Sequence, residues 1–242
     1  MRRRGLLIVA IVLALLLSLA PGPASAEVVF DLYFGGAFTA WDDLSARFDQ
    51  TFQILEDVGY DDSIIGGGRI AYWFDRPIVD RLTFGIGLDV FHFTPDIDFQ
   101  TVDGAQTFGG LTLAGEFAVF PIDISVVAVG LDLMVRWPLM PSRDFPRGRL
   151  QPYLTAGPAV FFSEIEDTDN FSPGNQSDKD TTVGFKIGTG MVWYLVPNLA
   201  VFGEWRFTYF SPEWNVTDNG VSGKLETDIS TFYLLVGLSL RF

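Results

Sequence analysis

Residues 82–91 read LTFGIGLDVF and decide the fold, because large apolar residues alternate along them with small or polar ones. The even positions hold leucine, phenylalanine, isoleucine and valine, whereas the odd positions from 83 to 89 hold Thr83, Gly85, Gly87 and Asp89. A period of two places successive side chains on opposite faces of a β-strand. One large apolar face and one small polar face indicate a strand with lipid outside and a packed polar interior.

Seven further segments repeat this pattern. The eight together are 28–40, 64–74, 81–93, 124–137, 149–162, 182–196, 199–210 and 228–242. Each is long enough for the ~9–11 tilted residues with which a strand crosses a bilayer. A soluble sandwich or a lipocalin-like barrel would place its charges outside. The sequence therefore predicts an all-β fold, an eight-stranded antiparallel transmembrane β-barrel.

The connections between these segments alternate in length. Short ones lie at 75–80, 138–148 and 197–198, and long ones at 41–63, 94–123, 163–181 and 211–227. Short periplasmic turns and long extracellular loops are typical of bacterial outer-membrane barrels. Within the second long connection, Leu111–Phe120 is strand-like and could extend as a hairpin above the membrane.

Aromatic residues cluster at both ends of the segments. We expect them to form girdles at the headgroup level, where amphipathic rings are favoured. The members are Tyr72, Trp73, Phe74, Trp137, Trp193, Tyr194 and Phe242 on the short-turn side, and Trp41, Phe91, Phe93, Phe161, Phe162, Tyr209, Phe210 and Trp214 on the long-loop side.

The amino terminus predicts export. A basic start is followed by the apolar run Leu6–Ala20, and Ala24-Ser25-Ala26 supplies a small-x-small cleavage site. The alternative is a transmembrane anchor, but the run is shorter than the ~20 residues that a spanning helix needs. We therefore expect residues 1–26 to be a removed signal peptide and residues 27–242 to be an outer-membrane β-barrel domain in a Gram-negative type of cell.

The charge balance excludes several classes of protein. The chain has 30 acidic and 16 basic residues, and removal of three N-terminal arginines leaves 30 against 13, a net charge of -17. A nucleic-acid partner is not expected, because a polyanion needs a basic surface. Cysteine is absent and His92 is the single histidine, which excludes thiolate and multi-histidine metal sites, and no cofactor is expected.

The acidic residues concentrate in the long connections. Clustered carboxylates suit divalent cations as ligands, so cations at the acidic loops are candidate partners. The other interpretation is a solvated anionic cap. The short-turn side is basic by contrast, with Arg76, Arg81, Arg143, Arg147, Arg149 and Arg241.

Several fragments resemble the OmpA-like family of eight-stranded outer-membrane barrels, also called porin-family proteins. They are residues 66–74 (GGGRIAYWF), 151–157 (QPYLTAG), 184–190 (GFKIGTG), 198–206 (NLAVFGEWR) and 237–242 (GLSLRF). The resemblance implies the barrel fold, contact with outer-membrane lipid and lipopolysaccharide, and a monomeric state. The terminal Phe242, preceded by alternating apolar residues, is similar to the signal that the barrel-assembly machinery reads.

The alternation also assigns charges to the barrel interior. These are Asp31, Arg69, Asp89, Asp132, Arg136, Lys186, Glu204 and Arg206, four acids and four bases. Eight strands enclose little more than their own side chains, and buried charges must be paired. The first interpretation is a structural ion network that plugs the lumen. The second is a narrow polar pathway that selects ions.

An enzyme is not expected. His92 lies near the external end of its strand on the lipid-facing side, and no serine or acid neighbours it in the sequence. We therefore predict a non-catalytic barrel, a membrane-stabilising or adhesive surface protein with acidic extracellular loops. The alternative is a small porin or OmpW-like conduit for ions or small apolar solutes.

Overall fold

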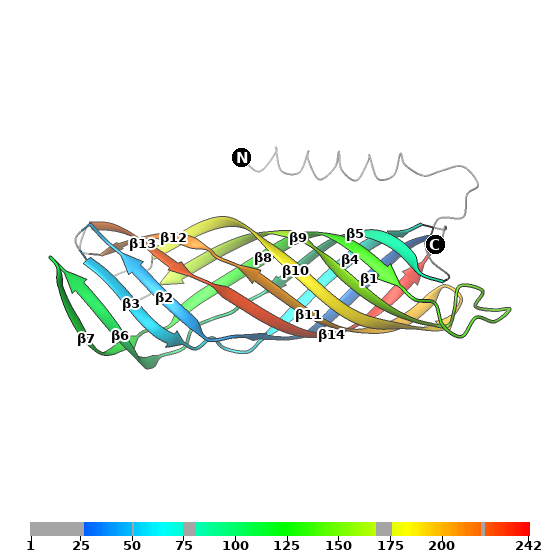
Figure 1. The fold of residues 1–242 in the computed structure, drawn as a ribbon, viewed down its shortest axis with the longest axis horizontal. Helices are drawn as coiled ribbons and strands as arrows, with labels where there is room; N and C mark the ends of the chain where they lie inside the picture. The colour runs from blue at the N-terminus through cyan, green and yellow to red at the C-terminus, as the bar shows by residue number, and fades with distance from the viewer. Residues whose placement is uncertain (1–26, 50, 75–80, 168–175, 219–220) are drawn as a thin grey trace.

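The computed structural model describes residues 27–49, 51–74, 81–167, 176–218 and 221–242. These residues form fourteen β-strands, and among them no helix is long and apolar enough to cross a membrane. Eight strands close an antiparallel barrel (Figure 1). Their order around it is β1 (Glu27–Thr39), β14 (Ile229–Arg241), β11 (Leu199–Phe210), β10 (Gln176–Val196), β9 (Leu150–Asp167), β8 (Ile122–Arg136), β5 (Thr83–Phe93) and β4 (Ser63–Trp73). The predicted fold class is confirmed.

The long connections carry a second sheet, which we call the crown. Its order is β12 (Glu213–Asp218), β13 (Val221–Thr227), β2 (Asp42–Arg47), β3 (Thr51–Val58), β6 (Gln100–Phe108) and β7 (Leu111–Val119). The hairpin at 111–120 is confirmed, since β7 pairs with β6 across Gly109 and Gly110, both with positive φ. Other long connections hold strands too: β2 pairs with β3, and β12 pairs with β13, which satisfies their backbone groups. β9 and β10 also continue into 163–181.

The crown pairs the segment that follows β1 with the segment that precedes β14. β1 pairs with β14 along the barrel, from Val29 opposite Arg241 to Thr39 opposite Thr231. Beyond that pair, β2 and β13 pair again in the crown, with Leu44 opposite Thr227. The chain termini of the described part lie at the opposite end of the barrel (Figure 1).

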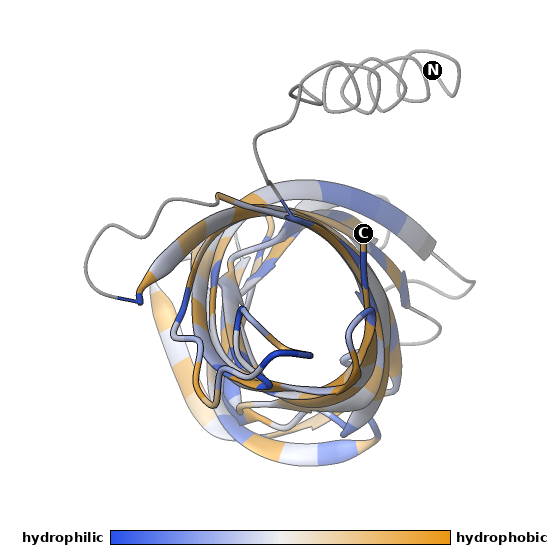
Figure 2. Ribbon diagram, turned by 90° about the vertical axis from the view of Figure 1, so that its right-hand side faces the viewer, coloured by the Kyte–Doolittle hydropathy of each residue, from blue (hydrophilic) through white to orange (hydrophobic). Residues whose placement is uncertain are grey.

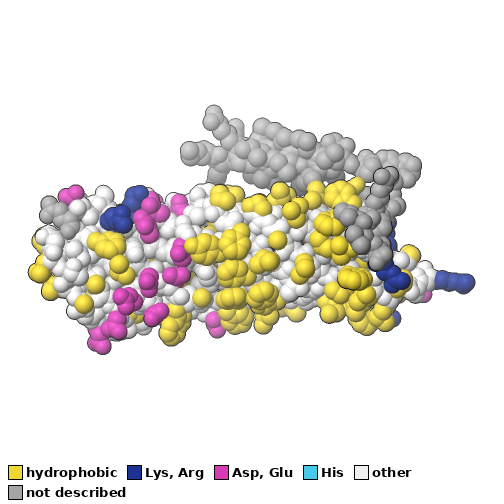
Figure 3. All heavy atoms as spheres, viewed as in Figure 1, with side chains coloured by type: hydrophobic (Ala, Val, Ile, Leu, Met, Phe, Trp, Pro, Cys, Tyr) yellow, Lys and Arg dark blue, Asp and Glu magenta, His cyan; other side chains and the backbone are white. Residues whose placement is uncertain are grey.

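The two faces of the barrel differ as the alternation predicts. Hydropathy changes from residue to residue along each strand in the view down the axis (Figure 2). Apolar side chains such as Leu32, Leu133 and Val183 are 55–71% exposed on the outside. On the face shown in Figure 3 they form a band; most of the acidic side chains gather toward the crown end, and basic ones lie at both ends. An apolar outer band with a polar interior fits a barrel surrounded by lipid.

Part of the predicted girdle is wrong. Seven of its aromatic residues are buried inside the molecule instead of lying on its outer surface: Trp73, Phe91, Phe93, Phe161, Tyr194, Phe210 and Trp214. Nearness to a strand end indicates a level along the barrel axis, but the face depends on the parity of the position. Tyr72, Trp137, Trp193 and Phe162 are at least partly exposed.

Glycines make room for the long interior side chains. Lys186 stands opposite Gly157, Arg206 opposite Gly188 and Asp89 opposite Gly130 on neighbouring strands. A Cβ atom at Gly130 would lie 3.1 Å from Nζ of Lys186. Because glycine has no side chain, the charged partner can lie over the neighbouring strand and reach the barrel axis.

Candidate functional site

A connected network of charges fills the middle of the barrel. Arg69 on β4 contacts Asp31 on β1 through Nη2 at 2.8 Å, and it reaches across the lumen to Oε2 of Glu204 on β11 at 2.9 Å. Arg206 then contacts Oε1 of Glu204 at 2.7 Å through Nη2. The side chains of all four residues are at most 6% exposed. The network thus links walls of the barrel that are not adjacent.

The network continues through Asp89 to β10 and β8. Nη2 of Arg206 lies 3.1 Å from Oδ2 of Asp89, and the ammonium of Lys186 pairs with Asp89 and, at 3.0 Å, with Oδ2 of Asp132. Tyr33 donates from its hydroxyl to Oδ1 of Asp89 at 2.6 Å. The second oxygen of Asp132, Oδ1, is buried without a hydrogen-bond partner. Lys186 is therefore the cation on which Asp132 depends.

A second cluster lies at the periplasmic end around Glu27, which is 1% exposed. Its carboxylate accepts two hydrogen bonds from Arg136, at 3.0 and 2.7 Å, and one from Arg147 at 3.1 Å. Nε of Arg241 lies 2.8 Å from the same carboxylate. The structure therefore separates Arg136 from the central network. The remaining predicted residues contribute four acids and three bases in the centre, while Glu27 faces three arginines.

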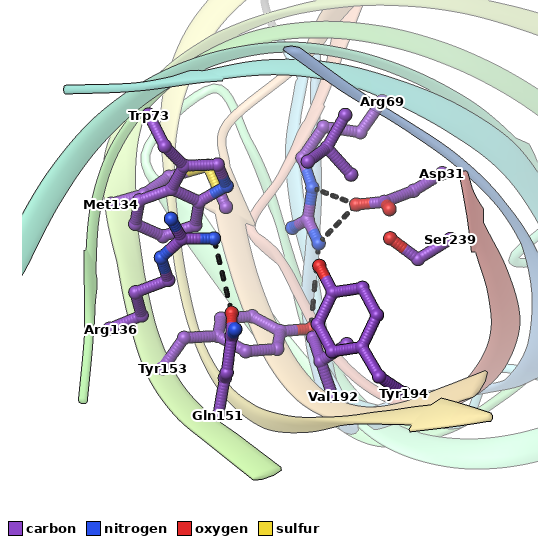
Figure 4. Close-up of a pocket in the computed structure, with 11 residues that line it drawn as sticks. Asp31, Arg69, Trp73, Met134, Arg136, Gln151, Tyr153, Val192, Tyr194 and Ser239 are labelled. Atoms are coloured by element: carbon purple, nitrogen blue, oxygen red, sulfur yellow. Dashed lines mark hydrogen bonds and ion pairs between the residues drawn. The ribbon is translucent and has the colours of Figure 1, made fainter. Parts of the chain in front are cut away.

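A small cavity of about 20 Å³ separates the two clusters. In Figure 4, Arg69 with Asp31 and Tyr153 lies on one side, and Arg136 with Gln151 and Trp73 lies on the other. The guanidinium of Arg136 is 4.3 Å from the centre of the Trp73 ring. Such a volume holds about one water molecule, so it is not a channel.

An aromatic layer covers the central network on the crown side. Phe161 and Phe210 stack with ring centres 4.1 Å apart, and Phe93 meets Tyr233 edge-on at 5.4 Å. Phe91 lies directly on the charges, 5.2 Å from the guanidinium of Arg206. The same hydrophobic cluster continues through Trp214 into the crown. The lumen is therefore filled successively by ions, by aromatic rings and by the crown core.

The sequence reasoning missed the hydrogen-bonding partners of the predicted charges. Tyr153 donates to Oε2 of Glu204 at 2.6 Å, and Tyr33 accepts from Nη1 of Arg206 at 3.0 Å. Both tyrosines have the inward parity of their strands, which is a usable signal. Glu27 also shares the parity of Asp31, but the predicted strand began one residue later.

His92 acquires a neighbour that its sequence context lacks. On the outer surface, its Nε2 lies 3.2 Å from Oγ of Ser125 on β8. Glu164 stands opposite Ser125 on β9 but pairs with Lys179. Among the described residues, no carboxylate is hydrogen-bonded to the His92 ring.

The two remaining predicted features concern cations and assembly. Within the described ranges, no three carboxylate or histidine side chains are placed to hold a metal ion together. Phe242 is 77% exposed, and its backbone N–H donates to the carbonyl of Val28 at 2.9 Å. Arg76, predicted on the basic side, lies outside the described residues.

No family model and no curated protein sequence matches the chain. Among solved structures it is similar to the outer-membrane protein OprG from Pseudomonas aeruginosa, with 15% identity and a TM-score of 0.50 over 88% of this chain and 95% of that one. The outer-membrane protease OmpT from Escherichia coli shares 9% identity with a TM-score of 0.47, covering 89% of this chain and 97% of that one. The attachment invasion locus protein Ail of Yersinia pestis shares 10% identity with a TM-score of 0.40, covering 90% and 98%.

The chain thus has the fold of the outer-membrane β-barrels, and this fold fits the predicted location in a Gram-negative outer membrane. At these identities the likeness concerns the fold alone.

Proposed function

We propose that the protein is a non-conducting, non-catalytic outer-membrane barrel that presents the crown to partners outside the cell. The observation that carries the proposal is the continuous filling of the lumen by the ion network and the aromatic layer. Charges held by ion pairs at 2.7–3.1 Å are not free to exchange with passing ions. In this proposal the eight charges predicted from the sequence are a structural plug.

The crown supports the second half of the proposal. Loops that only close a barrel need no sheet of their own, yet here six strands share one hydrophobic core with the barrel. β7 forms an edge of this sheet, and Leu111 and Leu113 on it are 66% and 63% exposed. Open edges with exposed apolar side chains are places where another chain can pair. β7 is therefore the part of the crown that we assign to contact.

Single-channel recording of the refolded mature protein tests the closed lumen. With insertion verified, we expect no conductance steps. Reproducible steps would favour the alternative, a conduit for ions or small solutes, and would reject the plug.

A crown deletion tests the contact function. Residues 99–120 are replaced by a Gly-Asn-Gly turn, which removes β6 and β7 and keeps the bridge between Ile97 and Ile122. Cells that display the intact protein should aggregate or attach to protein-coated surfaces more than cells that display the deletion. The heat-dependent gel mobility of the two barrels serves as the folding control. Equal attachment with two folded barrels would reject contact through β7.

A further inference from the structure

The two edges of the crown sheet differ in how their backbone groups are covered. At β12, the backbone N–H of Asn215 donates to the carboxylate of Asp178 at 2.6 Å, and that of Glu213 donates to Asp180 at 3.3 Å. At the other edge, β7 pairs with β6 alone in the described ranges. An open edge is usually blocked by lysine, by proline or by covering groups, and β7 contains neither of these residue types. The crown thus has one covered edge and one open edge.

The turn of the β6–β7 hairpin determines which backbone groups the open edge presents. Phe108 pairs with Leu111 across two glycines, both with positive φ. A two-residue turn of this kind joins a hydrogen-bonded pair, and such pairs alternate along the hairpin with pairs that are not hydrogen-bonded. The backbone groups of Leu111 and Leu113 therefore point to β6. The N–H and C=O groups of Thr112 and Ala114 point to the open side.

The open edge also lies in an uncharged part of an acidic crown. Residues 104–115 contain no charged side chain, whereas residues 42–62 contain seven acidic residues and one basic residue. Every residue from 111 to 115 is exposed, and Leu113 is 63% exposed. Two copies of an acidic crown repel each other, because like charges raise the energy of close approach. The segment 111–115 is therefore the part of the crown through which two copies can approach with the least repulsion.

We propose that β7 pairs with β7 of a second copy of this protein, antiparallel and centred on Leu113. This inference rests on the contact function proposed for the crown and names the partner. In this register Leu113 lies opposite Leu113 of the other copy, and Leu111 lies opposite Gly115. Thr112 exchanges main-chain hydrogen bonds with Ala114 on both sides of the centre, because these are the groups that point to the open side. The pairing satisfies open main-chain groups of both copies and sets no charge against a like charge.

The direction of β7 places the second copy in a facing membrane. Antiparallel strands of two identical chains are related by a two-fold axis that is perpendicular to both strands. For two copies in one membrane this axis would be the membrane normal, and β7 would lie parallel to the membrane surface. Figure 1 shows β7 running obliquely along the barrel axis instead. A contact of five residues a side is also far smaller than the roughly 20–30 of a stable interface, so it gains strength only where many copies meet.

Charge variants at the centre of the register test the proposal on cells that display the protein. Leu113→Asp alone and Leu113→Lys alone should each reduce clumping about tenfold or more, because like charges meet across the two-fold axis. A mixture of these two cell types, labelled in different colours, should form mixed clumps again. Thr101→Asp adds the same charge at an exposed position of β6, away from the open edge, and should clump as the intact protein does. Heat-dependent gel mobility verifies that each variant is folded.

A second mixture separates this proposal from the contact function on which it rests. Cells with the intact protein should clump with one another and exclude cells in which residues 99–120 are replaced. Self-pairing is wrong if intact cells clump equally with both cell types, or if the mixed charge variants do not clump, while attachment to protein-coated surfaces still requires residues 99–120. If the replacement changes neither clumping nor attachment, the contact function is wrong as well.

Discussion

Replacing Lys186 by methionine should destabilise the barrel strongly through a carboxylate that loses its cation. Lys186 is fully buried, and its ammonium lies 3.0 Å from Oδ2 of Asp132. Methionine keeps much of the length and shape of lysine, so the change removes the charge with little change in packing.

The magnitude follows from what each carboxylate retains. Asp89 keeps Arg206 at 3.1 Å and the Tyr33 hydroxyl at 2.6 Å, whereas no other ion pair to Asp132 is formed within the described ranges. Leaving one buried charge unpaired costs about 3–5 kcal/mol. In the double variant Lys186→Met/Asp132→Leu each remaining central carboxylate keeps an arginine partner, and replacement of a buried ion pair by apolar side chains is often neutral. We therefore expect the double variant to recover most of the loss.

Urea unfolding of the refolded protein in lipid vesicles measures both variants, with tryptophan fluorescence and heat-dependent gel mobility as independent probes. The midpoint should fall for the single variant at an unchanged slope, and return toward the parent value for the double variant. A loss below about 1 kcal/mol in Lys186→Met, well under the range for a broken buried pair, would refute the view that Lys186 neutralises Asp132.

Three further predictions concern the outer face, the packing of the interior and the crown. Ile86→Arg on the outer face of β5 should lower the free energy of unfolding by about 2–4 kcal/mol, and Thr83→Ser should change it little; equal urea midpoints would show that the faces are assigned wrongly. Gly67→Val would place Cβ 2.6 Å from the Tyr33 hydroxyl and should lower the free energy of unfolding by about 1–3 kcal/mol. Gly66→Val, where no atom lies within 4 Å of the added Cβ, should be tolerated in the same urea assay. A tolerated Gly67→Val would argue against this packing. Partial burial, reinforced by neighbouring carboxylates, raises the pKa of three crown-side carboxyls. Each of the three therefore binds its proton more tightly in the folded protein than in the unfolded chain, and their contribution to stability grows as the pH falls from 7 toward about 4.5. Amide exchange of β2, β3 and β6, corrected for intrinsic rates, should therefore slow at pH 5 relative to pH 7, and faster exchange would contradict the sign; the carboxyls are Asp42, Asp61 and Asp96.

The fold could be predicted from the sequence because alternation of period two is a local signal that each strand carries by itself. The same signal assigns the inward face, and the eight charges that it selects lie inside the barrel. It does not fix the level of a residue along the axis. For this reason the sequence places Arg136 in one group with Arg69, whereas the structure places it beside Glu27.

The missing parts of the site depend on register and on contacts between distant segments. Glu27 meets Arg136 and Arg147 across 109 and 120 residues, and His92 meets Ser125 across 33. A local sequence pattern does not predict contacts between residues so far apart in the chain. The sequence does not predict the crown for a similar reason. β13 and β2 become neighbours only when β1 and β14 pair in the barrel.

The β2–β13 pairing has a consequence for the seam between β1 and β14. In a barrel closed by one pair of strands, this seam is the natural place for lateral opening. Here β2 and β13 form a second antiparallel pair beyond the β1–β14 pair, with Leu44 opposite Thr227 and Arg47 opposite Lys224. The strands at the two sides of the seam are therefore held together at two levels, in the barrel wall and in the crown.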